Sequence, residues 1–286
     1  MGAANYYSKD FEWDQLRQET ENNPCFAHHL LPFPYNSTTK NQDSPVQDSE
    51  AWNNFHTRHS TGKFFKERRY LLKEFPELAS SGKCSTVLEI GCGNGSTALA
   101  ILRGNKSISL YACDCSKEAL DRAKENIEAA NINLAIERFY PFQCDFSVSG
   151  FPNWLVCTSC CENFPQKQNM CSSVPLHRMS RAITECFFVL KPGGLLLFRD
   201  YGLYDMTMLR FEPEQRVGYR EYMRSDGTRS YFFCLDNVRD LFCGTGFTEL
   251  ELEYCCVQSV NRRNGKIMRR VWIHGKFQKP HVHADS

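Results

Sequence analysis

The sequence predicts an α/β fold whose sheet is mostly parallel and ends in an antiparallel hairpin. The sequence has two short apolar runs, 86–90 and 109–113, separated by a helical stretch. The first run is followed by Gly91 and the second by Asp114. This order is typical of parallel strands joined by crossover helices. Near the C-terminus, apolar and acidic residues alternate over 249–254, and Asn264-Gly265 precedes another apolar run. This second pattern predicts two antiparallel strands joined by a tight turn.

The first 80 residues divide into two segments of different composition. Residues 1–48 are rich in Asn, Ser, Thr, Pro and Gln. Such a segment buries too little apolar surface to hold one conformation, so we expect a flexible N-terminal arm. Residues 49–80 mix aromatic and basic side chains and predict a helical cap. Three interpretations of this cap stay open: a helix that covers the sheet, a lid over a ligand, and a nucleic-acid surface.

The stretch 86–95, T-V-L-E-I-G-C-G-N-G, ends in three alternating glycines, Gly91, Gly93 and Gly95. It predicts a buried strand that runs into a loop whose backbone lies against a ligand. The third glycine comes one residue too early for the dinucleotide-binding fingerprint, and Glu89 would be unfavourable beside a pyrophosphate. An ammonium and a sulfonium are both favoured beside that acid, which indicates S-adenosylmethionine. A tight strand-to-helix turn without a ligand is the alternative.

Two further acids follow apolar runs. Asp114 comes directly after 109–113, where a carboxylate can bind the two ribose hydroxyls of adenosine. Asp145 ends the next run and can accept a hydrogen bond from the adenine amino group; a surface turn is the alternative interpretation. Between them, Ser116 predicts the N-cap of a crossover helix whose apolar residues recur every three or four positions up to Ala130.

A second amphipathic helix comes later in the chain and ends at the helix-breaking residues 191–194, Lys-Pro-Gly-Gly. Its apolar stripe is Met179, Ile183, Cys186, Phe187 and Leu190. The apolar run 195–198 then restarts the sheet.

Length and composition set only broad limits. The chain has 286 residues, of which 42% are hydrophobic, and a formal net charge of +1. This is ample for a sizeable core, and the net charge excludes no class of partner. No apolar run is long enough to span a membrane, and the first residues contain no apolar run of the kind found in secretory signals. We therefore expect no membrane association, and we expect the 15 cysteines to be reduced thiols in the cytoplasm or nucleus.

Together these residues resemble class I S-adenosylmethionine-dependent methyltransferases, which have a Rossmann-like fold. Three strings make the resemblance narrower: 198–205, F-R-D-Y-G-L-Y-D; 208–211, M-L-R-F; and 224–233, R-S-D-G-T-R-S-Y-F-F. They closely resemble the methyltransferase-like enzymes that form 3-methylcytidine in the anticodon loop of tRNA. The similarity covers roughly residues 51–279. It implies a methyltransferase domain over 49–280, with a substrate-side insertion over 199–235 and a short tail over 281–286.

The resemblance also implies what the chain binds. S-adenosyl-L-methionine is expected to contact the glycine loop and the acids named above, together with Trp52 on the N-terminal cap. His56 stands where relatives can carry a tyrosine, and we include it in the cofactor site. The implied substrate is cytidine 32 of a subset of tRNAs. An aminoacyl-tRNA synthetase or another protein helps selection in some members of the family.

Cytosine N3 is largely unprotonated at neutral pH and carries an in-plane lone pair, so catalysis depends on positioning more than on a general base. The base must be extruded or already unstacked. We expect Asp200 to accept a hydrogen bond from the exocyclic amine, with an ion pair to Arg199 or Arg210 as the alternative. The tRNA backbone is expected to meet a set of arginines: Arg199, Arg224, Arg229, Arg262, Arg263 and Arg269. A solvated hairpin end is the alternative for the last three.

One segment departs from the family pattern. The fold needs a fourth apolar strand after Asp145, and only Trp154–Thr158 offers one. If the segment 151–172 has been altered so that activity is lost, the chain is an RNA-binding pseudo-methyltransferase, which is the main alternative function. A nicotinamide-dependent oxidoreductase is a second alternative, disfavoured by the glycine spacing. The cysteines at 157, 160 and 171 fit no strong zinc template, so we expect no metal.

Overall fold

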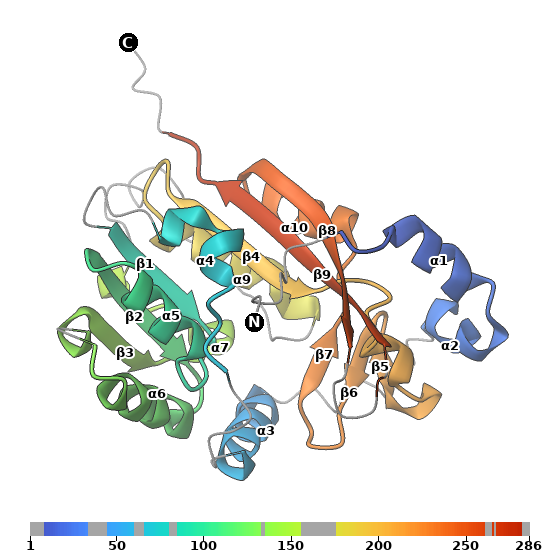
Figure 1. The fold of residues 1–286 in the computed structure, drawn as a ribbon, viewed down its shortest axis with the longest axis horizontal. Coiled ribbons are helices and arrows are strands. Elements are labelled where there is room, and N and C mark those ends of the chain that lie inside the picture. The colour runs from blue at the N-terminus through green and yellow to red at the C-terminus, as the bar shows by residue number, and fades with distance from the viewer. Residues whose placement is uncertain are drawn as a thin grey trace. The chain divides into compact units, whose positions relative to one another are not determined.

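The computed structural model describes residues 9–33, 45–59, 66–79, 85–132, 135–155, 176–260, 265 and 267–281. They form two compact units, and the elements of both can be followed in Figure 1. The first unit is made by the described parts of residues 43–145 with 225–228. The second is made by the described parts of 5–42, 146–224 and 229–286.

The first unit contains a three-stranded parallel sheet in the order β1-β2-β3. Its strands are β1 (Ser85–Ile90), β2 (Ile108–Asp114) and β3 (Phe139–Gln143). Leu110, Ala112 and Cys113 on the central strand are completely buried, as expected for a parallel strand that is covered on both faces. Because the strands run in the same direction, the residues that follow them meet at one edge of the sheet. The predicted parallel sheet is confirmed.

Two helices connect these strands: α5 (Ser96–Gly104) follows β1, and α6 (Lys117–Ala129) follows β2. Ser116 caps α6, since its Oγ accepts a hydrogen bond from the Ala119 backbone N–H at 3.2 Å, as the sequence predicts. Gly95 begins α5 with φ +78°, and a Cβ there would lie 3.0 Å from the Ala123 Cβ. Glycine at this position therefore allows the left-handed turn and the close approach of α6.

The predicted cap over 49–80 forms three short elements in its described parts. They are α3 (Pro45–Arg58), α4 (Leu71–Glu74) and η3 (Pro76–Leu78). The aromatic side chains of Phe55 and Phe75 are buried, which fits a cap that packs on the first unit. A further short 3-10 helix, η4 (Ile136–Arg138), precedes β3.

The second unit contains an antiparallel sheet in the order β4-β9-β8. Its strands are β4 (Leu195–Tyr201), β8 (Thr248–Val260) and β9 (Ile267–Gln278), so the predicted C-terminal hairpin is confirmed. The helices α9 (Leu176–Val189) and α10 (Leu235–Cys243) contribute to one core cluster with this sheet. In that cluster Phe242 stacks on Phe277 with ring centroids 4.4 Å apart. Full burial of each ring contributes about 1.5–3 kcal/mol.

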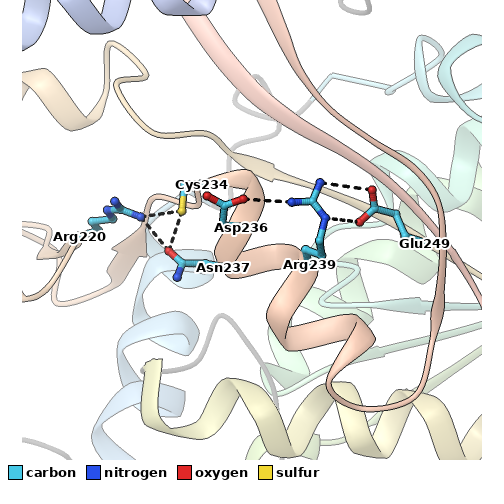
Figure 2. A network of polar contacts seen from close by, with 6 residues as sticks. All are labelled: Arg220, Cys234, Asp236, Asn237, Arg239 and Glu249. Atoms are coloured by element: carbon cyan, nitrogen blue, oxygen red, sulfur yellow. Dashed lines mark hydrogen bonds and ion pairs between the residues drawn. The ribbon is translucent and has the colours of Figure 1, made fainter.

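Polar contacts join residues of α10, and its N-cap Cys234, to neighbouring segments (Figure 2). Arg220 donates from Nη1 to Asn237 Oδ1 at 2.7 Å and to Cys234 Sγ at 2.8 Å, which ties the start of the helix to the turn at residues 219–220. Arg239 binds Asp236 at 3.0 Å and Glu249 at 2.9 Å, which ties the helix to β8. Arg220 itself has φ +60°, an uncommon backbone conformation for a residue with a side chain.

The described part of the N-terminal segment corrects the prediction of a flexible arm over 1–48. Residues 9–33 form α1 (Trp13–Glu21), η1 (Pro24–Phe26) and α2 (Ala27–Leu30). Leu16 is 2% exposed, and Trp13 stacks on Tyr254 with ring centroids 4.4 Å apart. Trp13 Nε1 also donates to the Leu203 carbonyl at 3.2 Å. The segment is ordered because a few of its aromatic and apolar side chains pack against other parts of the second unit, although its average composition is polar.

The predicted insertion over 199–235 forms a small antiparallel sheet after β4. Its strands are β5 (Arg216–Gly218), β6 (Glu221–Met223) and β7 (Arg229–Tyr231), in the order β5-β6-β7. Two 3-10 helices precede them, η6 (Met208–Arg210) and η7 (Pro213–Gln215). Tyr222 and Phe232 are completely buried, so this segment has an aromatic core. Of the predicted tail, only His281 lies within the described residues.

Of the stretch 154–158, which could serve as the fourth strand, only residues 154 and 155 are described, and they are not in a strand. After the short helix α7 (Phe146–Ser149), residues Asn153–Leu155 form a 3-10 helix, η5, and Trp154 is 60% exposed. An exposed aromatic side chain on a tight turn cannot serve as part of a central strand. The rest of the predicted strand and the cysteines at 157, 160 and 171 lie outside the described residues. Within the described residues, the β1-β2-β3 and β4-β9-β8 sheets share no strand.

Candidate active site

The glycine loop follows β1 in the first unit and has three left-handed positions. Gly91, Gly93 and Gly95 have φ of +66°, +52° and +78°, a region that glycine occupies without steric cost. A Cβ at Gly91 would meet no described atom within 4 Å, whereas one at Gly93 would lie 3.4 Å from His56 Cε1. The loop therefore presents bare backbone at Gly91 and is covered by a side chain at Gly93.

Asp114, at the end of β2, organises this loop. It is 7% exposed, and its Oδ2 accepts a hydrogen bond from the Gly93 N–H at 2.9 Å. Its Oδ1 accepts from the Ser116 N–H, also at 2.9 Å. Each carboxylate oxygen can accept a second hydrogen bond. The acid is therefore held in a fixed orientation and keeps acceptor capacity for two hydroxyl groups.

Glu89, on β1, is a shielded acid with an unused acceptor. Its Oε2 atom is buried and has no hydrogen-bond partner among the described residues. Burial raises the pKa of Glu89 to about 7, while hydrogen bonding from Thr97 opposes the increase. An unpaired buried carboxylate oxygen is costly. A cationic ligand group would remove that cost, so the residue fits the ammonium of the predicted cofactor.

The helix α3 reaches the same edge of the sheet. The Ser49 hydroxyl donates to Asp145 Oδ2, and the Ser116 hydroxyl donates to Asn53 Oδ1 at 2.9 Å. His56 is 7% exposed. Burial lowers the pKa of His56, and the nearby Asp114 carboxylate opposes this change. The His56 ring therefore packs on the glycine loop, where burial favours its neutral form.

The first unit thus holds every residue that the sequence predicts for the cofactor: Trp52, His56, Glu89, Gly91, Gly93, Gly95, Asp114 and Asp145. Trp52 lies beside His56 on α3, with ring centroids 6.4 Å apart. Sequence reasoning missed Ser49 and Asn53, which contact the acids or their neighbours. Their signal is the spacing 49, 53 and 56, which places three side chains on one face of a helix.

Asp200 and the predicted tRNA contacts belong mostly to the second unit. Asp200, on β4, uses its Oδ1 to accept a hydrogen bond from the Tyr201 N–H at 2.7 Å. The Arg199 guanidinium stacks over Trp272 at 4.8 Å from the ring centroid. The catalytic role of Asp200 stays a prediction, and so does its ion-pair alternative.

Among the predicted tRNA-binding arginines, Arg229 is little exposed. It forms an ion pair with Glu221 at 3.5 Å, and the two side chains are only 9% and 10% exposed. The contact of Arg229 with tRNA stays a prediction. Arg224 is half-buried after β6, and Arg269 pairs with Glu19 at 2.6 Å while staying 39% exposed. Arg262 and Arg263 lie outside the described residues.

Two absences concern the described residues alone. No helix among them is long and apolar enough to cross a bilayer. None of their His, Cys, Asp and Glu side chains gather in a group of three or more that could hold a metal ion.

Comparison with known proteins defines the class first. A family model described as "Methyltransferase domain" matches residues 87–194, which include the glycine loop, Asp114 and Asp145. A SAM-dependent methyltransferase from Anabaena variabilis has a similar fold, with a TM-score of 0.56 and 14% identity, covering 83% of this chain and 96% of that one. The fold is therefore the Rossmann-like fold of S-adenosylmethionine-dependent methyltransferases, as the sequence predicts.

Closer relatives define the family. The human tRNA N(3)-cytidine methyltransferase METTL6 is 36% identical over 248 residues, which is 85% of this chain and 84% of the relative. The Drosophila melanogaster tRNA N(3)-methylcytidine methyltransferase Mettl2 is 33% identical over 292 residues, covering 94% of this chain and 83% of the relative. This chain belongs to the family of tRNA N(3)-cytidine methyltransferases. The oxidoreductase alternative is therefore wrong.

Proposed function

We propose that this chain uses S-adenosyl-L-methionine to methylate N3 of cytidine 32 in the anticodon loop of tRNA. Family membership supports the reaction. The observation that carries the proposal is the grouping of the glycine loop, Glu89, Asp114 and Asp145 in one unit at the ends of β1, β2 and β3. Ligands of α/β sheets bind at this end of the strands.

The residues present fit the cofactor. Glu89 has an unsatisfied buried oxygen for the ammonium group, and Gly91 leaves open space beside its backbone. Asp114 keeps acceptor capacity for the ribose hydroxyls, and Asp145 is an acceptor for the adenine amino group. When bound, the cofactor supplies an electrophilic methyl group on a sulfonium.

The protein's contribution to the reaction is positioning. Cytosine N3 already has a free lone pair, so the chain must hold N3 in line with the methyl group, which can remove several kcal/mol from the barrier. An anticodon loop lowers the cost of unstacking the base. We propose that Asp200 accepts a hydrogen bond from the exocyclic amine and so fixes the ring.

The proposal includes partners and location. Arg199, Arg224 and Arg269, with Arg262 and Arg263, are proposed to contact tRNA phosphates. We also propose that an aminoacyl-tRNA synthetase or another protein assists tRNA selection, and that the chain acts in the cytoplasm or nucleus, where tRNA is made and matured. Pull-down of a tagged chain with and without ribonuclease distinguishes a protein partner from an RNA-bridged one.

The direct test is methylation of a panel of unmodified tRNA transcripts by the purified full chain. Mass spectrometry of the digested nucleosides should show 3-methylcytidine, and a transcript with uridine at position 32 should stay unmethylated. Asp114→Ala should abolish the product through loss of cofactor binding. Asp200→Asn should bind cofactor normally and methylate slowly; methylation at the wild-type rate would remove the role of Asp200.

The pseudo-methyltransferase remains a second candidate because η5 replaces part of the expected fourth strand. Isothermal titration with S-adenosylmethionine separates the two functions. Binding that is lost in Asp114→Ala supports the enzyme. A folded chain that binds tRNA but not the cofactor supports the pseudoenzyme.

A further inference from the structure

The spacing of three side chains on α3 matches the spacing of the strands beneath it. Ser49 contacts Asp145 after β3, Asn53 contacts Ser116 after β2, and His56 lies over Gly93 after β1. Seven helical residues rise by about 10.5 Å, and two strand spacings span about 9.6 Å. One helix face therefore meets the ends of all three strands in turn.

The contact at Asn53 extends to Asp114 through a single residue. The Ser116 hydroxyl donates to Asn53 Oδ1 at 2.9 Å and accepts from the Ala119 N–H at 3.2 Å. The Ser116 backbone N–H donates to Asp114 Oδ1 at 2.9 Å. Ser116 is completely buried, so without Asn53 its hydroxyl proton would lose this partner. Asn53 therefore helps to fix the residue that orients Asp114.

The contact at Ser49 is direct. Its hydroxyl donates to Asp145 Oδ2, and so holds the carboxylate that is proposed to receive the adenine. The two α3 side chains that make these attachments, Ser49 and Asn53, are both neutral. They hold α3 in place without adding a charge beside Asp114 and Asp145. The negative charge of these two acids therefore stays available for the ligand.

We infer that Ser49 and Asn53 are positioning residues that couple the docking of α3 to cofactor binding. This inference rests on the proposed cofactor site. If α3 docks only when Asp114 and Asp145 are correctly oriented, a ligand that holds these acids in the same orientation stabilises the docked helix. By linkage, a substitution that weakens the docking of α3 also weakens binding of the ligand.

The chain offers a matched control for Asn53. Asn54 is the same residue type on the same helix, and its side chain is exposed. Replacement of either by Ala changes helix propensity equally, whereas only Asn53→Ala removes the contact with Ser116. We expect Asn53→Ala to weaken binding of S-adenosylhomocysteine about fivefold to twentyfold by isothermal titration. Asn54→Ala should bind as the wild type does.

Two further measurements separate positioning from a general loss of structure. Hydrogen exchange of residues 49–58 should slow when S-adenosylhomocysteine is added to the wild type, and this protection should be reduced in Ser49→Ala and Asn53→Ala. In the methylation assay, both variants should raise the KM for S-adenosylmethionine and leave kcat within about twofold. The thermal melting curve of each ligand-free variant confirms that it is folded.

A double-mutant cycle tests the route through Ser116. If Asn53 acts through it, the effects of Asn53→Ala and Ser116→Ala on affinity should be clearly less than additive. Wild-type affinity and unchanged protection of α3 in both Ser49→Ala and Asn53→Ala would overturn the inference, while the proposed function would stand. Failure of the wild type itself to bind S-adenosylhomocysteine would instead contradict the proposed function at the cofactor site.

Discussion

Each unit buries a carboxylate, and the two carboxylates differ in how far they are satisfied. In the second unit, Asp205 is 0% exposed, and its oxygens accept hydrogen bonds from Thr207, Arg270 and Val271. In the first unit, the Oε2 atom of Glu89 is shielded and has no partner among the described residues. An acid whose partners all come from the chain stabilises the fold. An acid with an unused buried acceptor keeps that capacity for a ligand.

The difference extends to the surroundings of each acid. Arg270 pairs with Asp205 and stacks over Trp272 at 4.7 Å from the ring centroid, so the second unit neutralises its buried charge internally. Around Glu89 the neighbouring groups are the glycine loop, Thr97 at the start of α5, and Arg68, and burial still raises the pKa of Glu89. We therefore expect Asp205 to contribute to folding stability and Glu89 to ligand binding. Substitutions of each acid can test this.

Asp205→Ala should give the largest loss of stability. It leaves the Arg270 guanidinium without its ion-pair partner and frees two backbone N–H groups, so we expect the free energy of unfolding to fall by about 3–5 kcal/mol. Urea unfolding of the full chain measures this. Asp236→Ala is the control: its side chain is 86% exposed and pairs with Arg239 (Figure 2), so the loss should be within about 0.5 kcal/mol. Equal losses in both variants would contradict the comparison.

Gly95→Ala should destabilise the first unit by about 2–3 kcal/mol. The new Cβ would be held at φ +78° and lie 3.0 Å from the Ala123 Cβ, which adds steric overlap to backbone strain. Gly91→Ala meets no described atom within 4 Å and should cost only about 1–2 kcal/mol from its left-handed backbone. Differential scanning calorimetry distinguishes them. A larger loss for Gly91→Ala would show that strain, not packing, decides stability here.

Glu89→Gln should affect the ligand and not the fold. Gln keeps the shape of Glu and removes a desolvated charge, so stability should be unchanged or slightly higher. Affinity for S-adenosylmethionine should fall at least tenfold, about 1.4 kcal/mol, because the ammonium loses its carboxylate. Isothermal titration measures the affinity, and thermal melting measures the fold. If Glu89→Gln is strongly destabilised, Glu89 contributes to folding stability as Asp205 does, and the comparison is wrong.

The smallest expected effect is the pH dependence of Glu89. Its pKa in the ligand-free chain is raised by burial from 4.5 to about 7, so the residue is mostly neutral at pH 6 and mostly ionised at pH 8. Binding of a cation should therefore strengthen severalfold over this range and release a proton below pH 7. The contribution of Glu89 to the stability of the ligand-free chain should be greatest below pH 4.5 and be lost as pH rises through 7.

Titrations of S-adenosylhomocysteine in buffers of different ionisation enthalpy count the released protons. Glu89→Gln is the control and should show neither the proton release nor this pH dependence. A wild type whose affinity is flat from pH 6 to pH 8 would show that Glu89 is already ionised before the ligand binds.

Short sequence patterns were sufficient to predict the strands, helix starts and turns that depend on neighbouring residues in the chain. The apolar runs predicted β1 and β2, the side chain of Ser116 predicted the start of α6, and Asn264-Gly265 predicted the hairpin. The acids Asp114 and Asp145 were predicted because parallel strands bring their ends to one edge. The ordered helices of 9–33 were missed because their order depends on distant partners, as the stacking of Trp13 on Tyr254 shows. Average composition does not report such contacts.

The sequence by itself determined the class of fold and the family, and it predicted the residues of the candidate cofactor site, since these depend on periodicity, glycine positions and motif strings. Tertiary structure decided which charged side chains are shielded in ion pairs within the protein and which stay exposed to solvent. Arg229 and Arg269 are alike in sequence, yet one is shielded in an ion pair and the other is 39% exposed. It also decided that Ser49 contacts Asp145 and that Asn53 contacts Ser116. The physical reason is that desolvation and hydrogen bonding depend on neighbours in space, which residue type does not specify.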